Sequence, residues 1–183
     1  LRLEAGLYDG ATKILGEIRD AEAVNGTAIL NLSAELQNVN PWSAESPSLY
    51  TLVLTLADGR GRVLESVSSQ IGFRTTEVKG TQFLINGKVV LLKGTNIHEH
   101  DPVNGHTIDE ALILKDIRLM KMHNINAVRT SHYPQPERFY ELCDQYGLYL
   151  IDEANIESHG IGNDKDQTLA GKPEWLDQHM LRT

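Results

Sequence analysis

The chain has 183 residues, a length that predicts one domain or two small ones. Apolar residues make up 40 % and charged residues 23 %, which is ordinary for a globular protein and argues against disorder. The net charge of −8 argues against a general nucleic-acid binder, and no stretch has the roughly 18 apolar residues of a membrane span. We therefore expect neither nucleic acid nor a membrane as a partner.

The first 75 residues predict β-structure. Ile29–Leu36 nearly alternates apolar and polar residues, Leu49–Leu56 is rich in Leu, Val, Thr and Tyr, and Val63–Phe73 follows the turn signal Asp58–Gly61. Short strands separated by turns are typical of a β-sandwich, and a complete sandwich of this kind needs about seven strands. Four or five strands are evident here, which predicts part of a sandwich.

From Phe83 onward the pattern changes to alternating strands and helices. Asn86-Gly87 between apolar residues predicts a hairpin, and Val89–Gly94 predicts a strand buried on both faces of a parallel sheet. Four further elements are expected: a helix from Glu110 to about His123 capped by Asp109, with Ile113, Ile117 and Met120 on its apolar face; a strand at Ala127–Arg129; a helix over Pro136–Tyr146 ended by Gly147; and a strand at Leu148–Ile151. This order is typical of parallel βαβ units.

Three further residues are interpreted as packing residues. Cys143 lies inside a predicted helix, and a single cysteine excludes an internal disulfide. Trp42 and Trp175 are expected to pack in the interior rather than to stack on a sugar ring.

Both ends of the chain lie inside predicted elements. Leu1 begins an extended run without an initiator Met, and Pro173–Arg182 predicts a helix with Pro at its first position. We therefore expect this sequence to be a fragment of a longer protein.

Polar side chains follow each of the three predicted parallel strands. The segments are Asn96–Asp101, Arg129–Pro134 and Asp152–Gly160. In a (β/α)₈ barrel the carboxyl ends of the strands converge on one face, where the active site lies. The pattern therefore predicts the active-site face of such a barrel, with an open doubly wound sheet as the alternative.

The histidines and carboxylates after the strands leave several chemistries open. His98 and His100 could bind Zn²⁺, as in amidohydrolase-type barrels, or could be ordinary hydrogen-bonded loop histidines. Glu157 and His159 are spaced to face the same way, and an oxygen and nitrogen donor pair suits a divalent ion such as Mg²⁺. A third metal ligand would have to come from elsewhere.

Arg129 and His132 flank the end of the second predicted strand. Arginine binds hydroxyl-rich or anionic ligands, and histidine hydrogen-bonds sugar hydroxyls. The alternative for Arg129 is an ion pair with a neighbouring carboxylate.

Together these residues resemble glycoside hydrolase family 2, specifically its large bacterial β-galactosidase branch. The resemblance rests on Gly94–Pro102, Asn126–Pro134, Leu142–Gly147 and Asp152–Gly160, and more weakly on Asn40–Ser43, Pro47–Tyr50 and Ile71–Arg74. It implies a partial immunoglobulin-like β-sandwich at residues 1–75 and the N-terminal part of a (β/α)₈ TIM barrel at residues 76–183. Arg129–Pro134 is shared with β-glucuronidases, which makes that activity the alternative within the family.

The resemblance also implies roles for particular side chains. His98 and His132 correspond to histidines that line a galactosyl pocket and stabilise the transition state, with Arg129 as their partner. Glu157 and His159 correspond to two ligands of an active-site Mg²⁺. Ile97 departs from the pattern, because the family commonly has arginine there.

The implied activity is retaining hydrolysis of terminal β-D-galactosides, and the implied assembly is a homo-oligomer. Retaining glycosidases need an acid/base and a nucleophile carboxylate, about 5–5.5 Å apart. In this family the acid/base Glu follows an Asn, but no Asn-Glu dipeptide occurs in the chain. We therefore expect both catalytic carboxylates beyond Thr183, no catalytic residue in this chain, and no activity of the chain alone. A non-catalytic carbohydrate-binding module is the alternative from another functional class.

Overall fold

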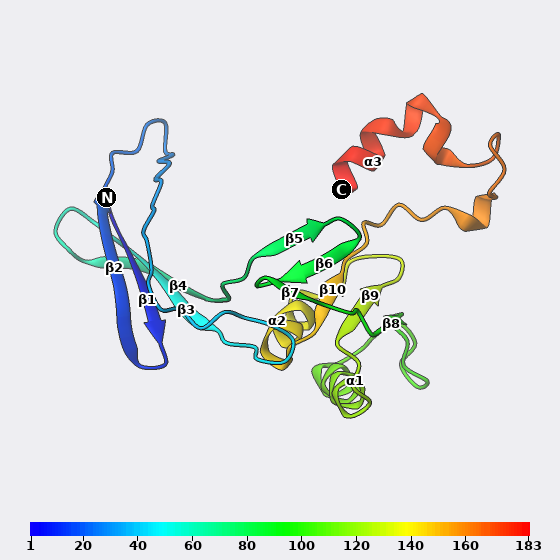
Figure 1. Cartoon of the computed structure of the whole chain (residues 1–183). Coiled ribbons are helices and arrows are strands. Elements are labelled where there is room, and N and C mark those ends of the chain that lie inside the picture. The colour runs from blue at the N-terminus through cyan, green and yellow to red at the C-terminus, as the bar shows by residue number, and fades with distance from the viewer. The chain divides into compact units, whose positions relative to one another are not determined.

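The computed structural model describes residues 1–183, which divide into two compact units, Leu1–Val90 and Leu91–Thr183. Each unit forms its own sheets (Figure 1). The domain boundary predicted after residue 75 lies between strands β4 and β5 of the first unit.

The first unit contains a four-stranded antiparallel sheet in the order β2-β1-β3-β4. Its strands are β1 (Arg2–Asp9), β2 (Thr12–Asp20), β3 (Tyr50–Ala57) and β4 (Val63–Ile71). The predicted turn between β3 and β4 is confirmed, and the side chain of Asp58 accepts hydrogen bonds there from the backbone N–H groups of Arg60 and Arg62.

One predicted strand of this unit is wrong. Residues 29–36 form no strand, and Ile29 is 86 % exposed. Alternating apolar residues stabilise a strand only where one face is buried against another layer and the backbone has a ladder partner. This segment pairs with none of the four strands of the sheet.

The first unit also contains a small antiparallel sheet in the order β5-β6-β7, with strands β5 (Thr76–Lys79), β6 (Gln82–Ile85) and β7 (Lys88–Val89). The predicted hairpin turn is confirmed, because Asn86 and Gly87 both have positive φ, of 51° and 73°, as a type I′ turn requires. The Asn86 side chain donates to the backbone oxygen of Trp42, which is 2 % exposed. The packing role predicted for Trp42 is therefore confirmed.

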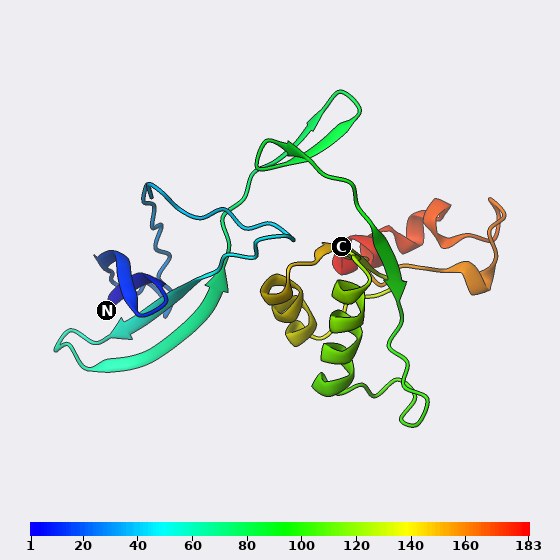
Figure 2. The ribbon, with the colours of Figure 1, turned by 60° about the horizontal axis from the view of Figure 1, so that its bottom comes forward.

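The second unit is built on a parallel sheet in the order β10-β9-β8. Its strands are β8 (Gly94–Ile97), β9 (Ala127–Thr130) and β10 (Tyr149–Ile151), and they alternate with helices α1 (Glu110–Met122) and α2 (Glu137–Tyr146). Consecutive strands are neighbours throughout, as in a barrel wall. Figure 2 shows α1 and α2 lying side by side.

A single hydrophobic core joins the two helices to the sheet. Its buried members are Ile113, Ile117, Met120, Val128, Phe139, Leu142, Cys143 and Leu148. All three residues predicted for the apolar face of α1 belong to it, and so does Cys143. Both predicted helix signals are also confirmed: the Asp109 side chain caps α1 at the N–H of Leu112, and Gly147 ends α2 in the left-handed conformation.

The strand predicted at Val89–Gly94 is misplaced, because β8 begins only at Gly94. The side chain of Asn126 donates to the backbone oxygen of Leu91 and accepts from the backbone N–H of Lys93. These backbone groups therefore bond a side chain instead of a neighbouring strand. Leu91 is 76 % exposed rather than buried in a sheet.

The chain ends in short helices: η1 (His159–Ile161), η2 (Leu169–Gly171), η3 (Pro173–Trp175) and α3 (Leu176–Arg182). The helix predicted at Pro173–Arg182 is confirmed, with a 3₁₀ first turn. Trp175 is 39 % exposed, so the interior packing predicted for it is wrong. None of the helices has the length and apolar character needed to cross a membrane.

Candidate functional site

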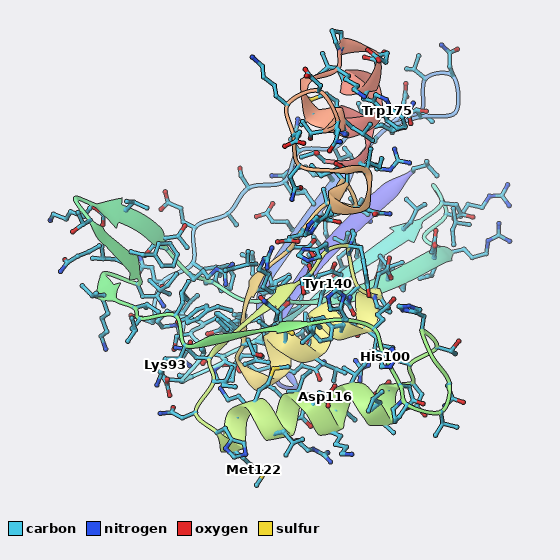
Figure 3. All side chains as sticks on the ribbon, turned by 90° about the vertical axis from the view of Figure 1, so that its right-hand side faces the viewer. Lys93, His100, Asp116, Met122, Tyr140 and Trp175 are labelled. Carbon is cyan, nitrogen blue, oxygen red and sulfur yellow. The ribbon has the colours of Figure 1, made fainter.

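The carboxyl ends of β8, β9 and β10 carry a cluster of polar side chains. The parallel register pairs Asn96 of β8 and Ile151 of β10 with Arg129 of β9, so the residues that follow each strand meet at one edge of the sheet. In Figure 3 the segment containing β8 runs from the labelled Lys93 to the labelled His100, and α1 lies alongside it. The cluster at this edge consists of His98, Arg129, His132 and Glu153.

The two histidines predicted for the pocket lie against each other. The rings of His98 and His132 have their centroids 5.6 Å apart and are inclined at 73°. The ring of His98 also lies beside that of Tyr133, with the two centroids 6.1 Å apart. The hydroxyl of Tyr133 accepts a hydrogen bond from the backbone N–H of Glu99 at 3.0 Å. Side chains from the ends of two neighbouring strands therefore form one aromatic, hydrogen-bonding surface.

Glu153 joins Arg129 to His132. One carboxylate oxygen of Glu153 accepts from Nε of Arg129, and the other lies 2.8 Å from Nδ1 of His132. The hydrogen bond to His132 and the bond to Arg129 hold the pKa of Glu153 below its usual value. Of the two interpretations left open for Arg129, the structure shows the ion pair with a carboxylate.

A second group of hydrogen bonds fixes the segment that carries Glu153. Thr130, which is fully buried, donates to Asp152 at 2.8 Å and accepts from the backbone N–H of Glu153 at 3.0 Å. The hydroxyl of Tyr140 donates to the same oxygen of Asp152 at 2.9 Å and accepts from the backbone N–H of Gln135. The start of α2 and the ends of β9 and β10 are thus tied together beneath the cluster.

Sequence reasoning missed the roles of Glu153, Asp152 and Thr130. The available signal was a pair of carboxylates immediately after one strand and an arginine at the end of another. Which carboxylate meets Arg129 depends on the register between β9 and β10, which the sequence pattern does not give.

His100 is not part of this cluster. Its ring faces that of His106, with centroids 6.2 Å apart, whereas His98 lies against His132. No three His, Cys, Asp or Glu side chains gather closely enough to hold a metal ion. His98 and His100 both line one small pocket beside α1, but no third His, Cys, Asp or Glu joins them to form a metal-binding group.

Glu157 and His159 lie together after β10. Nδ1 of His159 is 3.9 Å from Oε1 of Glu157, which also accepts from the backbone N–H of His159 at 3.0 Å. The His159 side chain is 75 % exposed, so its ring nitrogens are accessible. A carboxylate and an imidazole fit a divalent cation as two of its ligands, with water or further carboxylates completing the shell.

Ile97 is accommodated by the core. Its side chain packs against the buried cluster of the second unit, and its backbone oxygen accepts from the hydroxyl of Ser131 at 2.8 Å. The apolar side chain of Ile97 therefore supports packing.

Comparison with known proteins gives a consistent result over the whole chain. The family model described as "Glycosyl hydrolases family 2" matches residues 1–74, and the model described as "Glycosyl hydrolases family 2, TIM barrel domain" matches residues 76–183. A curated β-galactosidase of Alteromonas mediterranea is 42 % identical over 100 % of this chain and 18 % of its own length. A β-galactosidase of Photobacterium profundum is 51 % identical over 77 % of this chain and 14 % of its own length.

A solved structure with a similar fold is the β-glucuronidase of Bifidobacterium dentium complexed with coumarin-3-O-glucuronide. It is 33 % identical with a TM-score of 0.74, over 83 % of this chain and 24 % of that one. The chain therefore spans less than a quarter of the length of each of these relatives.

Proposed function

Because the chain belongs to glycoside hydrolase family 2, we propose that it forms part of a retaining β-galactosidase that hydrolyses terminal β-D-galactosides. The observation that carries this proposal is the meeting of His98, Arg129 and His132 at the carboxyl ends of neighbouring barrel strands. Active sites of TIM-barrel enzymes lie at this end of the strands. The curated relatives at 42–51 % identity that carry the name β-galactosidase support the substrate class.

His98 and His132 serve as the hydrogen-bonding residues of the galactosyl pocket. An imidazole nitrogen can accept from, or donate to, a sugar hydroxyl, and a fixed imidazole can stabilise the charge that develops in an oxocarbenium-like transition state. Arg129 supports these residues from β9.

The pairing of Arg129 also supports a neutral sugar over a uronic acid. A free guanidinium would attract the carboxylate of a glucuronide. In this site the positive charge is already met by the carboxylate of Glu153, which leaves a weaker attraction for a second anion.

Glu157 and His159 would hold Mg²⁺ together with ligands from outside this chain. The ion would supply a fixed positive charge beside the groups that handle protons in the reaction. The two residues of this chain contribute an oxygen and a nitrogen ligand, and the hydrogen bond from the His159 backbone fixes one oxygen of Glu157.

The catalytic pair of carboxylates comes from elsewhere in the longer protein. The family resemblance assigns neither catalytic role to Glu99, Glu153 or Glu157. Glu153 is moreover already engaged with Arg129 and His132, and Glu157 lies beside His159. Leaving-group protonation and formation of a glycosyl-enzyme both need a carboxylate free for that purpose.

The experiment compares hydrolysis of nitrophenyl β-D-galactoside and nitrophenyl β-D-glucuronide by the full-length protein and by the 183-residue chain. The expected result is a higher kcat/KM for the galactoside with the full-length protein, and no turnover with the chain alone. Faster hydrolysis of the glucuronide would establish the alternative activity of the family. Saturable galactose binding without hydrolysis of either compound would establish a non-catalytic binding module.

A further inference from the structure

Nδ1 of His132 lies beside one hydrogen-bond acceptor and one hydrogen-bond donor. Oε2 of Glu153 lies 2.8 Å away and Nη2 of Arg129 lies 3.4 Å away. A carboxylate only accepts hydrogen bonds and a guanidinium only donates them. In the neutral imidazole, Nδ1 can therefore bond Glu153 as an N–H group or Arg129 as a bare nitrogen, but it cannot do both.

Distance favours Glu153. Both partners are ionised, so charge alone does not choose between them, but 2.8 Å is within the usual range of a charge-assisted hydrogen bond whereas 3.4 Å is at the limit of any hydrogen bond. Arg129 is held by Glu153 without a bond to Nδ1, because its Nε donates to the other oxygen of Glu153. The two partners of Glu153 thus take one oxygen each.

Glu153 is itself held in place. Its backbone N–H donates to Thr130, whose hydroxyl donates to Asp152. The carboxylate is therefore a fixed acceptor, because its backbone is anchored to β9 and its two oxygens are occupied by residues from the end of the same strand.

We propose that Glu153 is a positioning residue that keeps the proton of His132 on Nδ1 and leaves Nε2 as a bare acceptor for a substrate hydroxyl. That the group donating to Nε2 is a sugar hydroxyl rests on the proposed function. None of the hydrogen bonds in the structure uses Nε2 of His132. The tautomer of a histidine is set by the hydrogen bond that its other nitrogen makes.

This assignment has a consequence for substrate choice. A bare nitrogen accepts from a hydroxyl, but it repels an ionised carboxylate, which has no hydrogen to donate. Glu153 therefore favours a neutral galactoside over a glucuronide in two ways: it neutralises Arg129 and it presents the lone pair of Nε2.

The first test reads the tautomer of His132 directly. ¹⁵N NMR of the imidazole nitrogens in the 183-residue chain distinguishes N–H from bare nitrogen, and spectra recorded across a pH series identify the neutral imidazole, in which only one nitrogen carries a hydrogen. The expected result for His132 is an N–H at Nδ1 and a bare Nε2. An N–H at Nε2 in the wild-type chain would overturn the proposal, whatever the variants do.

Two variants and a control show whether Glu153 is the cause. Glu153→Ala removes the acceptor and is expected to give a mixture of tautomers, whereas Glu153→Gln retains an acceptor oxygen and is expected to restore much of the Nδ1–H form. Glu99→Ala removes another carboxylate at the same edge that does not contact His132, and it is expected to change nothing. An unchanged tautomer in Glu153→Ala would contradict the proposal. If that variant does not fold, the wild-type spectrum and Glu153→Gln decide.

The kinetic test uses the full-length protein. Glu153→Ala is expected to lower kcat/KM for nitrophenyl β-D-galactoside by about tenfold or more, the loss typical of one charged hydrogen bond, and to narrow the preference over the glucuronide. Glu99→Ala is expected to leave that preference unchanged. Loss of activity with an unchanged preference would contradict a role in substrate choice. Absence of galactoside hydrolysis in the wild type would reject the proposed function, whereas the tautomer would still decide the role of Glu153.

Discussion

Asn126 determines where the strand that leads into the site begins. Its buried side chain bonds the backbone of both Leu91 and Lys93, and β8 starts directly after them. Replacement by leucine leaves both backbone groups without this partner. We expect Asn126→Leu to lower the free energy of unfolding by about 2 kcal/mol, at about 1 kcal/mol for each lost hydrogen bond. Urea denaturation followed by circular dichroism measures the loss.

The matched control for that substitution is Asn155→Leu. Asn155 is exposed and lies beyond the strand ends, where surface substitutions usually change the free energy of unfolding by less than about 0.5 kcal/mol. Equal losses in the two variants would show that Asn126 does not anchor the start of β8.

Cys143 gives a prediction that depends on pH. Burial raises the pKa of its thiol to about 12. The unfolded chain, with a thiol pKa of about 8.5, therefore releases its proton first as the pH rises, and the folded state loses stability above that pH. We expect the free energy of unfolding to fall between about pH 8.5 and pH 12 more steeply in the wild type than in Cys143→Ala. Parallel urea titrations of the two proteins across this range check the slope, and identical slopes would contradict the prediction.

At the scale of single residues, the sequence was sufficient to identify His98, Arg129 and His132 as candidate site residues, but not to predict the contacts between them. Their types and their positions after strands are visible in the sequence. The partner of Arg129 is not, because it depends on a strand register and on the side-chain geometry of Glu153. The roles assigned to Glu157 and His159 stay predictions.

The packing of helix α1 on the sheet decides the stability of the second unit. Ile117 is completely buried in the shared core, whereas Leu119 of the same helix is 42 % exposed. We expect Ile117→Ala to lower the free energy of unfolding by about 2–5 kcal/mol, because it removes buried surface and leaves a cavity. Leu119→Ala is the control and should cost much less. Thermal or urea unfolding of both variants gives the comparison, and equal losses would mean that α1 does not pack as described.

At the scale of elements, helices were predicted better than strands. Local signals define α1 and α2. They are an Asp cap at the start of α1, apolar residues that recur about every 3.6 residues, and a Gly at the end of α2. The predicted strands at residues 29–36 and 89–94 depended on partners that the sequence does not specify. Where such a partner was absent, or a side chain took its place, the expected strand did not form.

The whole chain has unpaired strand edges. In the parallel sheet, β8 and β10 each pair with β9 on one side only, and Ile151 of β10 is exposed. Edges with free backbone groups and apolar side chains invite pairing with another copy. We expect the isolated chain to self-associate, and sedimentation velocity at several concentrations measures this. A single monomeric species at all concentrations would contradict it. The homo-oligomer implied by the resemblance is a separate proposal for the longer protein.

The fold class was predicted at the scale of the whole molecule because two kinds of pattern follow each other along the chain. Short strands with turns precede alternating strands and helices, and the family matches fall on the two halves in the same order. The substrate class rests on a few side chains at the strand ends, so an experiment that locates the bound sugar is needed to test it.

The most direct measurement is a crystal structure of the full-length protein with galactose bound. We expect a sugar at the carboxyl ends of β8 and β9, with hydroxyl oxygens within hydrogen-bond distance of His98 and of Nε2 of His132. A galactose bound elsewhere, with neither imidazole in contact with it, would contradict the role of these two histidines as the galactosyl pocket.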